Sequence, residues 1–389
     1  MSRSPWRRPT TWLAVVALIA VSALAWVIVQ PPAPTPVRAT VQGLRPRADI
    51  AGFERVTAPR TLAFPADHGP HTGFQTEWWY YTGNVQTSSG RAFGYQFTIF
   101  RRALAPAAPA GGSLSSNQIY FAHFAVSDVA AGTHQAFERF SRGAGGLAGA
   151  SADPFRVTLE DWSIVGPDAA SVRVQAHQEN WAIDLTLEAA KPLTLHGDRG
   201  LSQKSPEPGN ASFYYSFTRM ATQGRMTTPA GSFDVGGGSW MDHEWSTSVL
   251  SQDTRGWDWF ALQLNDGSEL MYYRLWQADG SDNPATSGTW VLADGTRQTL
   301  SRVDVALSAL DKWTSPTTGA TYPSGWRLSV PSRGLDLTIT PRMRDQEMRL
   351  STTYWEGAVS IEGTLAGKPI KGRGYVELTG YAAPITDRL

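Results

Sequence analysis

Cysteine is absent from the 389 residues of this chain. Its absence excludes disulfides, thiolate nucleophiles, Cys-ligated zinc, iron–sulfur clusters and the lipid-bearing cysteine of a bacterial lipoprotein. Charge is also scarce, at 17% of residues, against roughly 25% in an average soluble domain. Because 34 Lys and Arg balance 34 Asp and Glu, the chain lacks the positive surface by which proteins bind nucleic acid. We therefore expect no nucleic-acid partner.

Several catalytic motifs are missing as well. The sequence contains no Gly-x-Ser-x-Gly nucleophile elbow, no Walker loop, no metal-binding histidine pair at helical spacing and no dinucleotide fingerprint on a strand–helix unit. The motifs therefore do not predict a classical serine hydrolase.

The residues that are abundant indicate an all-β fold. The chain has 37 Gly, 25 Pro and 16 Trp, a composition unsuited to long helical bundles. Aromatic and β-branched residues alternate with a period of two, which is typical of strands, and Asn265-Asp266-Gly267 predicts a hairpin turn. Residues 303–312 alone predict a short helix. Strands are expected at 78–81, 91–100, 118–126, 155–164, 172–187, 213–220, 257–264, 269–276, 288–292, 326–328, 335–340, 354–362 and 371–381.

The first thirty residues are a membrane anchor or an export signal. Arg3, Arg7 and Arg8 precede an uncharged, mostly apolar run over residues 12–29. This run is longer than the ~7–15 residues of a signal core and matches the ~17–25 of a spanning helix, so we favour a retained anchor over a cleaved signal. The arginines place the N-terminus in the cytoplasm. We expect the rest of the chain in the cell envelope, anchored to the inner membrane with its bulk periplasmic, or secreted if the N-terminus is cleaved.

A proline-rich linker over residues 31–60 separates this segment from the folded part. Beyond the linker, a similar unit occurs twice. Glu77-Trp78-Trp79 and Asp258-Trp259-Phe260 each place an acid before two aromatics, followed by a hairpin and a tyrosine-containing return strand. We therefore predict two tandem β-barrels at 61–238 and 239–389, dividing within 231–245. The alternative is that aromatic hairpins resemble each other by chance.

The densest group of candidate catalytic residues is Asp242-His243-Glu244, bracketed by Trp240 and Trp245. Side chains alternate along a strand, so Asp242 and Glu244 share one face and His243 points to the other. This alternation argues against a metal site built from the three residues alone. It supports a carboxyl group buried against tryptophan, whose pKa rises until it can donate a proton near neutrality. The alternative is a structural acid bonded to neighbouring backbone.

A second group lies near the start of the folded part. His68 and His71 occupy a Gly/Pro loop, and zinc there needs a third ligand such as His123 or Glu77. Loop histidines more often serve as hydrogen-bonding residues, so we expect no metal. Glu77 precedes four aromatics and is either a buried carboxylate or a rim residue.

The candidate ligand-binding residues are mostly aromatic. His123 lies within an apolar strand, where it is either a hydrogen-bonded core residue or a ligand contact. Two C-terminal patches, around Tyr354-Trp355-Glu356 and over 375–381, combine aromatics with acids, although the second is better explained as a barrel-closing strand. The candidate set is Trp78, Trp79, Tyr81, His123, Trp240, Trp245, Trp257, Trp259, Tyr354 and Trp355.

Four long motifs, in order, resemble those of a known family. They lie at 67–84, at 239–246 continuing to 256–260, at 354–357 and at 374–381. Together they resemble the lipocalin-like AttH / carotenoid 1,2-hydratase (hydroxyneurosporene synthase) family, in the branch often labelled predicted secreted hydrolases. The resemblance runs from about residue 61 to 381.

The resemblance implies two consecutive lipocalin-like β-barrels, with a ligand cleft formed by the barrel interiors and their junction. It also implies hydration of the terminal double bond of an acyclic carotenoid without a redox cofactor. Asp242 carries over as the acid, because it lies in the central motif. The exported chain and the run Asp242-His243-Glu244 fit the secreted branch better than the hydratases proper. We therefore expect a cofactor-free hydratase or hydrolase acting on an apolar isoprenoid or lipid.

A second class of function fits the same barrels. A lipocalin-like protein can bind or carry a hydrophobic molecule in the envelope, beside a transporter, without catalysis. A deep apolar cavity serves binding and catalysis alike, whereas the buried acids favour catalysis.

Overall fold

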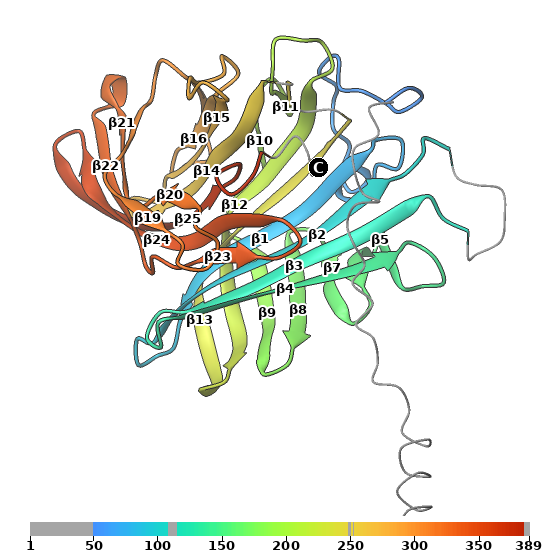
Figure 1. Cartoon of the computed structure of the whole chain (residues 1–389), viewed down its shortest axis with the longest axis horizontal. Helices are drawn as coiled ribbons and strands as arrows, with labels where there is room; N and C mark the ends of the chain where they lie inside the picture. The colour runs from blue at the N-terminus through green and yellow to red at the C-terminus, as the bar shows by residue number, and fades with distance from the viewer. Residues whose placement is uncertain (1–49, 108–114, 248–249, 252, 385–389) are drawn as a thin grey trace, which may run out of the picture. The chain divides into compact units, whose positions relative to one another are not determined.

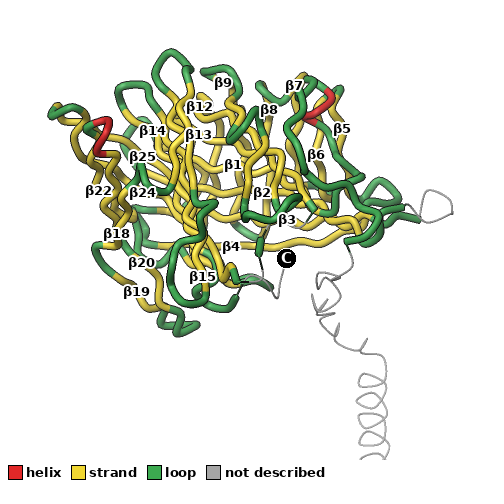
Figure 2. The backbone as a smooth tube through the Cα atoms, turned by 90° about the horizontal axis from the view of Figure 1, so that it is seen from above, coloured by secondary structure: helices red, strands yellow, loops and turns green. Residues whose placement is uncertain are grey.

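A computed structural model of the chain describes residues 50–107, 115–247, 250–251 and 253–384. In this part of the chain, strands and loops account for nearly all residues (Figures 1 and 2). The helical elements described are two short 3₁₀ turns, η2 (Ala66–His68) and η3 (Pro331–Arg333). The predicted all-β class is confirmed.

Thirteen antiparallel strands form the first sheet, in the spatial order β4-β3-β2-β1-β13-β12-β9-β8-β7-β6-β5, with β10 and β11 paired to β12. The sheet curls into a nearly closed barrel, since β4 at one end packs against β6 near the other. Its strands are β1 (Thr76–Gln86), β2 (Ala92–Ala103), β3 (Gln118–Asp128), β4 (Thr133–Arg142), β5 (Ala148–Ala152), β6 (Phe155–Leu159), β7 (Trp162–Asp168), β8 (Ser171–Gln178), β9 (Trp181–Ala189), β10 (Thr194–Leu195), β11 (Leu201–Gln203), β12 (Ala211–Thr228) and β13 (Gly231–Ser246).

Ten strands form the second sheet, in the order β17-β16-β15-β14-β25-β24-β22-β21-β18, with β23 paired to β24. A separate two-stranded ribbon consists of β19 (Lys312–Thr314) and β20 (Thr321–Pro323). The strands of the second sheet are β14 (Thr254–Leu264), β15 (Glu269–Gln277), β16 (Ser287–Val291), β17 (Arg297–Ser301), β18 (Ala306–Ala309), β21 (Trp326–Val330), β22 (Leu335–Pro341), β23 (Glu347–Arg349), β24 (Thr353–Leu365) and β25 (Lys368–Leu378).

The two sheets repeat one arrangement. In each, four successive strands form a meander, and the first of them also pairs with the last strand of the sheet: β1 with β13, and β14 with β25. The two acid–aromatic hairpins of the sequence are β1–β2 and β14–β15, which hold corresponding positions. The predicted hairpin turn at Asn265-Asp266-Gly267 is present, with Gly267 at φ +86°.

The sheets pack against each other through β1, β2, β12, β14, β24 and β25. In Figure 1 the red strands β24 and β25 lie beside the blue strand β1, although nearly 300 residues separate them in sequence. Both faces of β1 are therefore buried. Trp79 and Tyr81 point into the core of the first sheet, whereas Tyr80 lies in an aromatic cluster between the sheets. This double burial explains the unbroken aromatic run of β1.

The structure corrects the predicted helix and two of the predicted strands. Residues 306–309 of the predicted helix form strand β18, which pairs with β21 and in which Leu307 is half-buried and the other three residues are exposed. The predicted strands at 155–164 and 172–187 are each two strands, because the chain turns at Glu160 and Glu179, both with φ +55°. The first sheet continues through the predicted boundary at 238/239 to Ser246, and the second begins at Thr254.

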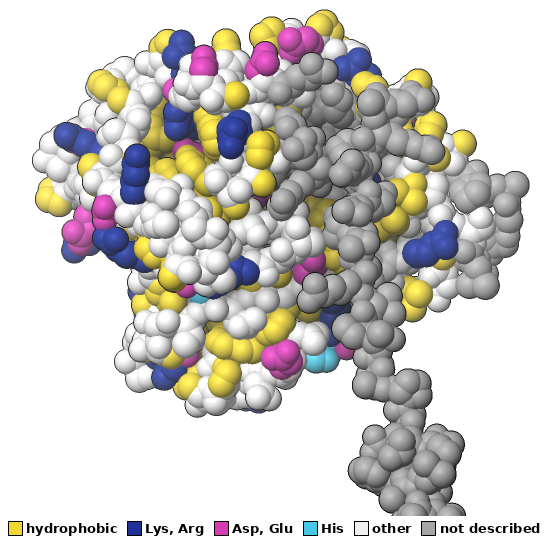
Figure 3. All heavy atoms as spheres, viewed as in Figure 1, with side chains coloured by type: hydrophobic (Ala, Val, Ile, Leu, Met, Phe, Trp, Pro, Cys, Tyr) yellow, Lys and Arg dark blue, Asp and Glu magenta, His cyan; other side chains and the backbone are white. Residues whose placement is uncertain are grey.

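The proposed anchor over residues 12–29 lies outside the described residues. Among the residues that are described, no helix has the length and apolar character needed to cross a membrane. Figure 3 shows one face of the molecule, on which acidic and basic side chains lie scattered in small mixed groups, in keeping with zero net charge.

Candidate functional site

Strand β13 separates the three adjacent ionisable residues onto two faces, as the alternation predicted. Asp242 and Glu244 face the second sheet, whereas His243 points into the first sheet between Met241 and Trp245. Two distinct polar clusters result, and we call them the interior network and the junction site.

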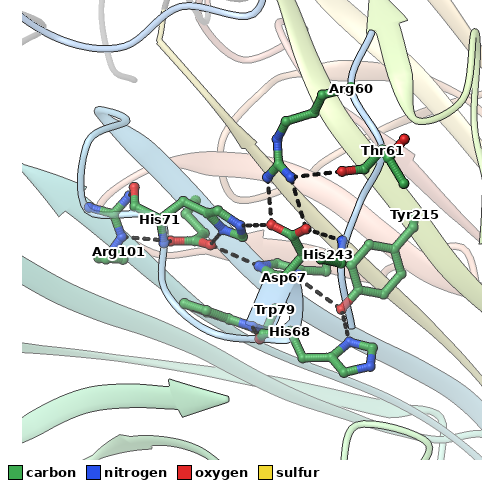
Figure 4. Close-up of polar contacts among 11 residues, drawn as sticks. Arg60, Thr61, Asp67, His68, His71, Trp79, Arg101, Tyr215 and His243 are labelled. Atoms are coloured by element: carbon green, nitrogen blue, oxygen red, sulfur yellow. Dashed lines mark hydrogen bonds and ion pairs between the residues drawn. The ribbon is translucent and has the colours of Figure 1, made fainter. Parts of the chain in front are cut away.

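The interior network is centred on Glu77, whose side chain is fully buried. Figure 4 shows residues of this network converging from the loop before β1 and from β2, β12 and β13. Glu77 Oε1 lies 2.7 Å from His71 Nδ1 and 2.9 Å from His243 Nε2, and Oε2 accepts from Arg101 Nε at 2.7 Å. Glu77 is therefore the buried carboxylate among the two sequence alternatives, and not a rim residue.

The network extends from Glu77 in two directions. On one side, His71 Nε2 lies 2.8 Å from Asp67, which also forms an ion pair with Arg60. On the other, His243 Nδ1 lies 3.0 Å from the Tyr215 hydroxyl. That hydroxyl in turn lies 2.7 Å from His68 Nδ1.

Charges in the network are distributed unevenly. Burial alone would raise the pKa of Glu77, but the Arg101 charge and the hydrogen bonds from His243 and His71 outweigh it and hold the pKa well below its usual range. Burial opposes protonation of His71 too, yet Asp67 and Glu77 raise its pKa. For His243, burial dominates and lowers the pKa to about 4. His71 is thus the protonated histidine of the network and His243 the neutral one.

His71, Glu77 and His243 place three ligand atoms within 4.8 Å of one another, a spacing that can suit a metal ion. The surrounding charges fit such an ion poorly. Arg60, Arg101 and protonated His71 already outnumber the two carboxylates, and His71 would have to lose its proton to ligate. His68 and His71, the histidine pair considered from the sequence, do not point to a common metal position, because His68 bonds the Tyr215 hydroxyl instead.

The junction site is centred on Asp242, which is 4% exposed. Its Oδ2 accepts from the Tyr214 hydroxyl at 2.6 Å, and its Oδ1 accepts from Trp240 Nε1 at 2.6 Å and from the Ser216 hydroxyl. Trp259 of the second sheet donates to the Tyr214 hydroxyl at 3.1 Å. Asp242 is thus linked through one tyrosine to the opposite sheet.

Burial raises the pKa of Asp242 to about 7, and the charge of Glu244 adds to the effect, while the three donors offset part of it. A carboxyl group with this pKa exchanges its proton readily near neutral pH. The neighbouring acid Glu244 is ion-paired with Lys204. Lys204 Nζ lies 3.1 Å from it and 4.1 Å from the centre of the Tyr273 ring.

Aromatic side chains from both sheets surround the junction site. The Trp259 ring packs edge-on against Tyr80, with centroids 5.2 Å apart, and against Trp240 at 6.3 Å. Trp78 and Trp257 pack at the margin of the same cluster. Such faces stabilise positive charge through their quadrupoles.

The candidate ligand-binding residues are divided among the junction site, the cores of the two sheets and a further contact between the sheets. Trp78, Trp240, Trp257 and Trp259 border the junction site. Trp79, Tyr81 and Trp245 lie in the core of the first sheet, where Trp245 stacks on His71 at 3.7 Å, and Trp355 lies in the core of the second. His123 and Tyr354 bond each other across the sheets at 2.8 Å.

Sequence reasoning missed four junction residues: Tyr80, Tyr214, Glu356 and Glu377. The position of Tyr80 could be predicted from strand alternation, because Tyr80 is two residues from Trp78 on β1 and therefore lies on the same face. Tyr214 requires the β12–β13 register, which pairs it with Glu244. Glu356 and Glu377 lie in the two C-terminal patches, the second of which was interpreted as a closing strand.

The fold and this site define a class: an all-β protein of two repeated sheets with buried carboxyl groups between them. A sequence model of the AttH-like family matches residues 55–381. The chain therefore belongs to the AttH-like family, as its motifs predicted.

Solved structures agree with this assignment. A crystal structure from Nitrosomonas europaea assigned to AttH is 33% identical with a TM-score of 0.76, covering 85% of this chain and 99% of that one. The crystal structure of kievitone hydratase from Nectria haematococca has a TM-score of 0.64, covering 85% and 98%. At 14% identity, the latter likeness shows the fold alone.

Two curated relatives are named for adding or removing water. Kievitone hydratase of Fusarium solani subsp. phaseoli is 24% identical over 230 residues, which is 56% of this chain and 62% of that protein. Dehydratase asqC of Emericella nidulans is 22% identical over 225 residues, 54% of this chain and 61% of the relative. The chain thus spans about three fifths of the length of these relatives.

Proposed function

We propose that this protein is a cofactor-free enzyme of hydratase type, which adds water to or removes it from an apolar isoprenoid or lipid at the junction site. The observation that carries the proposal is Asp242, a buried carboxyl group whose pKa is raised to about 7 among tryptophan and tyrosine rings. Relatives named kievitone hydratase and dehydratase asqC support the reaction class.

In the proposed reaction Asp242 donates its proton to a carbon–carbon double bond. A tertiary carbocation forms and the faces of Trp240 and Trp259 stabilise it. Water then bonds to the cationic carbon and releases one proton, so that an alcohol results. Tyr214, Ser216 and Trp240 donate hydrogen bonds to Asp242. These bonds stabilise the carboxylate that remains after proton transfer, so the same residues orient the acid and favour its ionisation in the transition state.

The proposed setting is the cell envelope, with residues 12–29 as an anchor or as a cleaved signal. Such a location would give the enzyme access to substrates dissolved in the membrane. Carbonate extraction of membranes distinguishes the two forms, since an anchored chain stays in the pellet and a chain that has lost residues 1–39 does not.

The test compares wild type, Asp242→Asn, Glu244→Gln and His243→Gln on two probes, squalene and geranylgeraniol, in detergent micelles. Incubation in ¹⁸O-labelled water and mass spectrometry detect each added water. Asn keeps the shape of Asp but has no acidic proton, so turnover should fall about 10²–10⁴-fold. Probe affinity and melting temperature should hold, since a buried carboxyl group is a cost to folding.

Glu244→Gln should lose less activity, because Glu244 acts on Asp242 only through its charge. Unchanged turnover in folded Asp242→Asn would exclude Asp242 as the acid. Tight probe binding by wild type without any water added would favour the alternative of a carrier of hydrophobic molecules.

A further inference from the structure

The second sheet contributes two acids to the junction site. Glu356 on β24 and Glu377 on β25 lie directly opposite each other in the strand register, so their side chains share one face of the sheet. Glu377 is also directly opposite Trp259, which borders the junction. The Tyr80 hydroxyl of the first sheet donates to Glu356 Oε1 at 2.5 Å. The shared face is therefore the one that meets the first sheet.

Neither acid is neutralised by a cation. None of the ion pairs among the described residues involves Glu356 or Glu377, whereas the buried Glu244 and Glu269 are each paired with lysine or arginine. Like charges directly opposite on neighbouring strands destabilise a sheet, and two close carboxyl groups cannot both ionise at low cost. The pair therefore holds at least one proton near neutral pH.

A buried oxygen of the pair lacks a hydrogen-bond partner among the described residues. Glu377 Oε2 accepts from Trp257 Nε1 at 2.8 Å. Glu356 is 1% exposed, and its Oε2 has no hydrogen-bond partner within the part of the chain described. A buried carboxyl oxygen without a partner is costly, and a polar group of a bound molecule would supply the missing hydrogen bond.

The repeat of the two sheets gives these acids a defined place. Glu377 lies opposite Trp259 on β14, as Glu244 lies opposite Trp78 on β1. Glu356 likewise corresponds to Tyr214 of the first sheet. Glu356 lies opposite Glu377 on β25, as Tyr214 lies opposite Glu244 on β13. The junction is thus formed by corresponding faces of both sheets, each of which brings carboxyl groups to it.

We propose that Glu356 and Glu377 form a second proton-transfer pair on the wall opposite Asp242, with Glu377 as the base for the attacking water. This inference rests on the proposed function. In the addition, a carbon–hydrogen bond forms with the proton of Asp242, and the oxygen of water bonds to the cationic carbon. Glu377 takes one proton from that water, so a hydroxyl group remains. A final proton transfer from Glu377 to Asp242 through solvent restores both groups.

The electrostatics agree with this geometry. Burial raises the pKa of Glu377 to about 7; Trp257 offsets part of this shift, and the charges of Asp242 and Glu244 add to it. Burial and then the charge of Glu377 raise the pKa of Glu356 well above its usual range, and the hydrogen bond from the Tyr80 hydroxyl offsets only part of this shift. Donor and acceptor of similar pKa allow the protons to pass in either direction, for addition or removal of water.

The first test needs no substrate. Infrared difference titration of the whole protein between pH 5 and 9 follows the carbonyl stretch of protonated, buried carboxyl groups. The variants Glu356→Gln and Glu377→Gln are made in an Asp242→Asn background, which removes the titration of Asp242. Each substitution should remove one band and move the remaining titration to lower pH by about one unit or more, since the partner charge is gone.

The exposed Glu362→Gln on the same strand β24 is the matched control and should leave the bands unchanged. Two independent titrations, or no protonated carboxyl group assignable to the pair above pH 6, would overturn the inference. Melting temperatures measured alongside show that each variant is folded, and Glu377→Asp replaces Glu377→Gln if the latter is not.

The second test separates the water base from the acid. With squalene in D₂O, Asp242 can still protonate and deprotonate the alkene when Glu377 is Gln. Glu377→Gln should therefore lose about 10²-fold or more of net hydration but retain deuterium exchange into the alkene, whereas Asp242→Asn loses both. Equal loss of exchange in both variants would exclude Glu377 as the water base. If wild type hydrates neither probe, the proposed function fails, while the infrared titration still decides whether the pair exists.

Discussion

The two sheets place an acid and an arginine at corresponding positions but surround them differently. In the first sheet Glu77 lies directly opposite Arg101, and in the second Asp258 lies directly opposite Arg274. Glu77 and Arg101 are both fully buried, with Oε2 and Nε 2.7 Å apart. Asp258 and Arg274 are 3.5 Å apart at Oδ2 and Nη1, and Arg274 is 29% exposed and also paired with Asp282.

The pKa values of the two acids move in opposite directions as a result. Arg101 and two histidines hold the pKa of Glu77 well below its usual range, against burial. Burial raises the pKa of Asp258 to about 6, because Tyr381 and a shared Arg274 compensate only in part. Equivalent register therefore fixes where an acid lies, whereas the number of donors around it decides whether it is ionised.

The largest expected difference between the sheets is in stability after neutralisation of each acid. Glu77→Gln leaves Arg101 buried without its counter-ion. Removing one partner of a buried ion pair typically costs about 3–5 kcal/mol. We expect the free energy of unfolding in urea at pH 7 to fall by about this amount, with a lower melting temperature.

Asp258→Asn is the matched comparison. Asn retains an acceptor for the Tyr381 hydroxyl, which donates to Asp258 Oδ1 at 2.8 Å, and Arg274 keeps Asp282 as a partner. This variant should not be destabilised at pH 7. Equal losses in the two variants would show that the environments of the two acids do not differ as described.

A smaller effect should appear in the pH dependence of stability. The folded-state pKa of Asp258, about 6, lies above its ordinary value of 3.8. Its contribution to stability is therefore fully present below pH 3.8 and lost as the pH rises through 6. This corresponds to about 3 kcal/mol over the interval. Urea unfolding should show Asp258→Asn and wild type alike near pH 4 and the variant more stable at pH 7.

Asp282→Asn sharpens this result. Asp282 both repels Asp258 and engages Arg274, so its removal should lower the pKa of Asp258 and shrink the pH-dependent loss. A difference between Asp258→Asn and wild type that stays constant from pH 4 to 7 would contradict the assignment.

Local patterns were enough to predict the arrangement along single strands. Alternation correctly separated Asp242 and Glu244 from His243, and Asn265-Asp266-Gly267 correctly gave the turn between β14 and β15. Both depend on residues adjacent in sequence, where side-chain direction is fixed by strand geometry.

Contacts between distant segments could not be predicted in the same way. His243 meets Glu77 across 166 residues because β13 pairs with β1 in one register, and a shift by one residue would turn each side chain to the other face. The bond between Tyr214 and Trp259 likewise depends on how the two sheets pack. The strand β18 was predicted as a helix because its short apolar run carries no decisive period.

The smallest expected effect concerns metal removal. It compares the interior network with the corresponding position in the second sheet, around Asp258, where no described group of side chains could hold a metal ion. Among the described residues, His71, Glu77 and His243 are the group whose ligand atoms lie close enough to hold an ion, and no such group includes Asp258. Dialysis against EDTA should leave the melting temperature unchanged, and the purified protein should contain no stoichiometric zinc or iron.

The reason is the charge already present around Glu77. Arg101 donates to it at 2.7 Å and His71 bridges it to Asp67, so both carboxylates are neutralised before any ion arrives. Binding would require His71 to give up a proton that Asp67 and Glu77 hold in place. His71→Gln should accordingly lower stability equally with and without EDTA. Zinc present at one ion per chain, and lost in His71→Gln, would instead show that the first sheet differs from the second by a metal site rather than by a network of fixed charges.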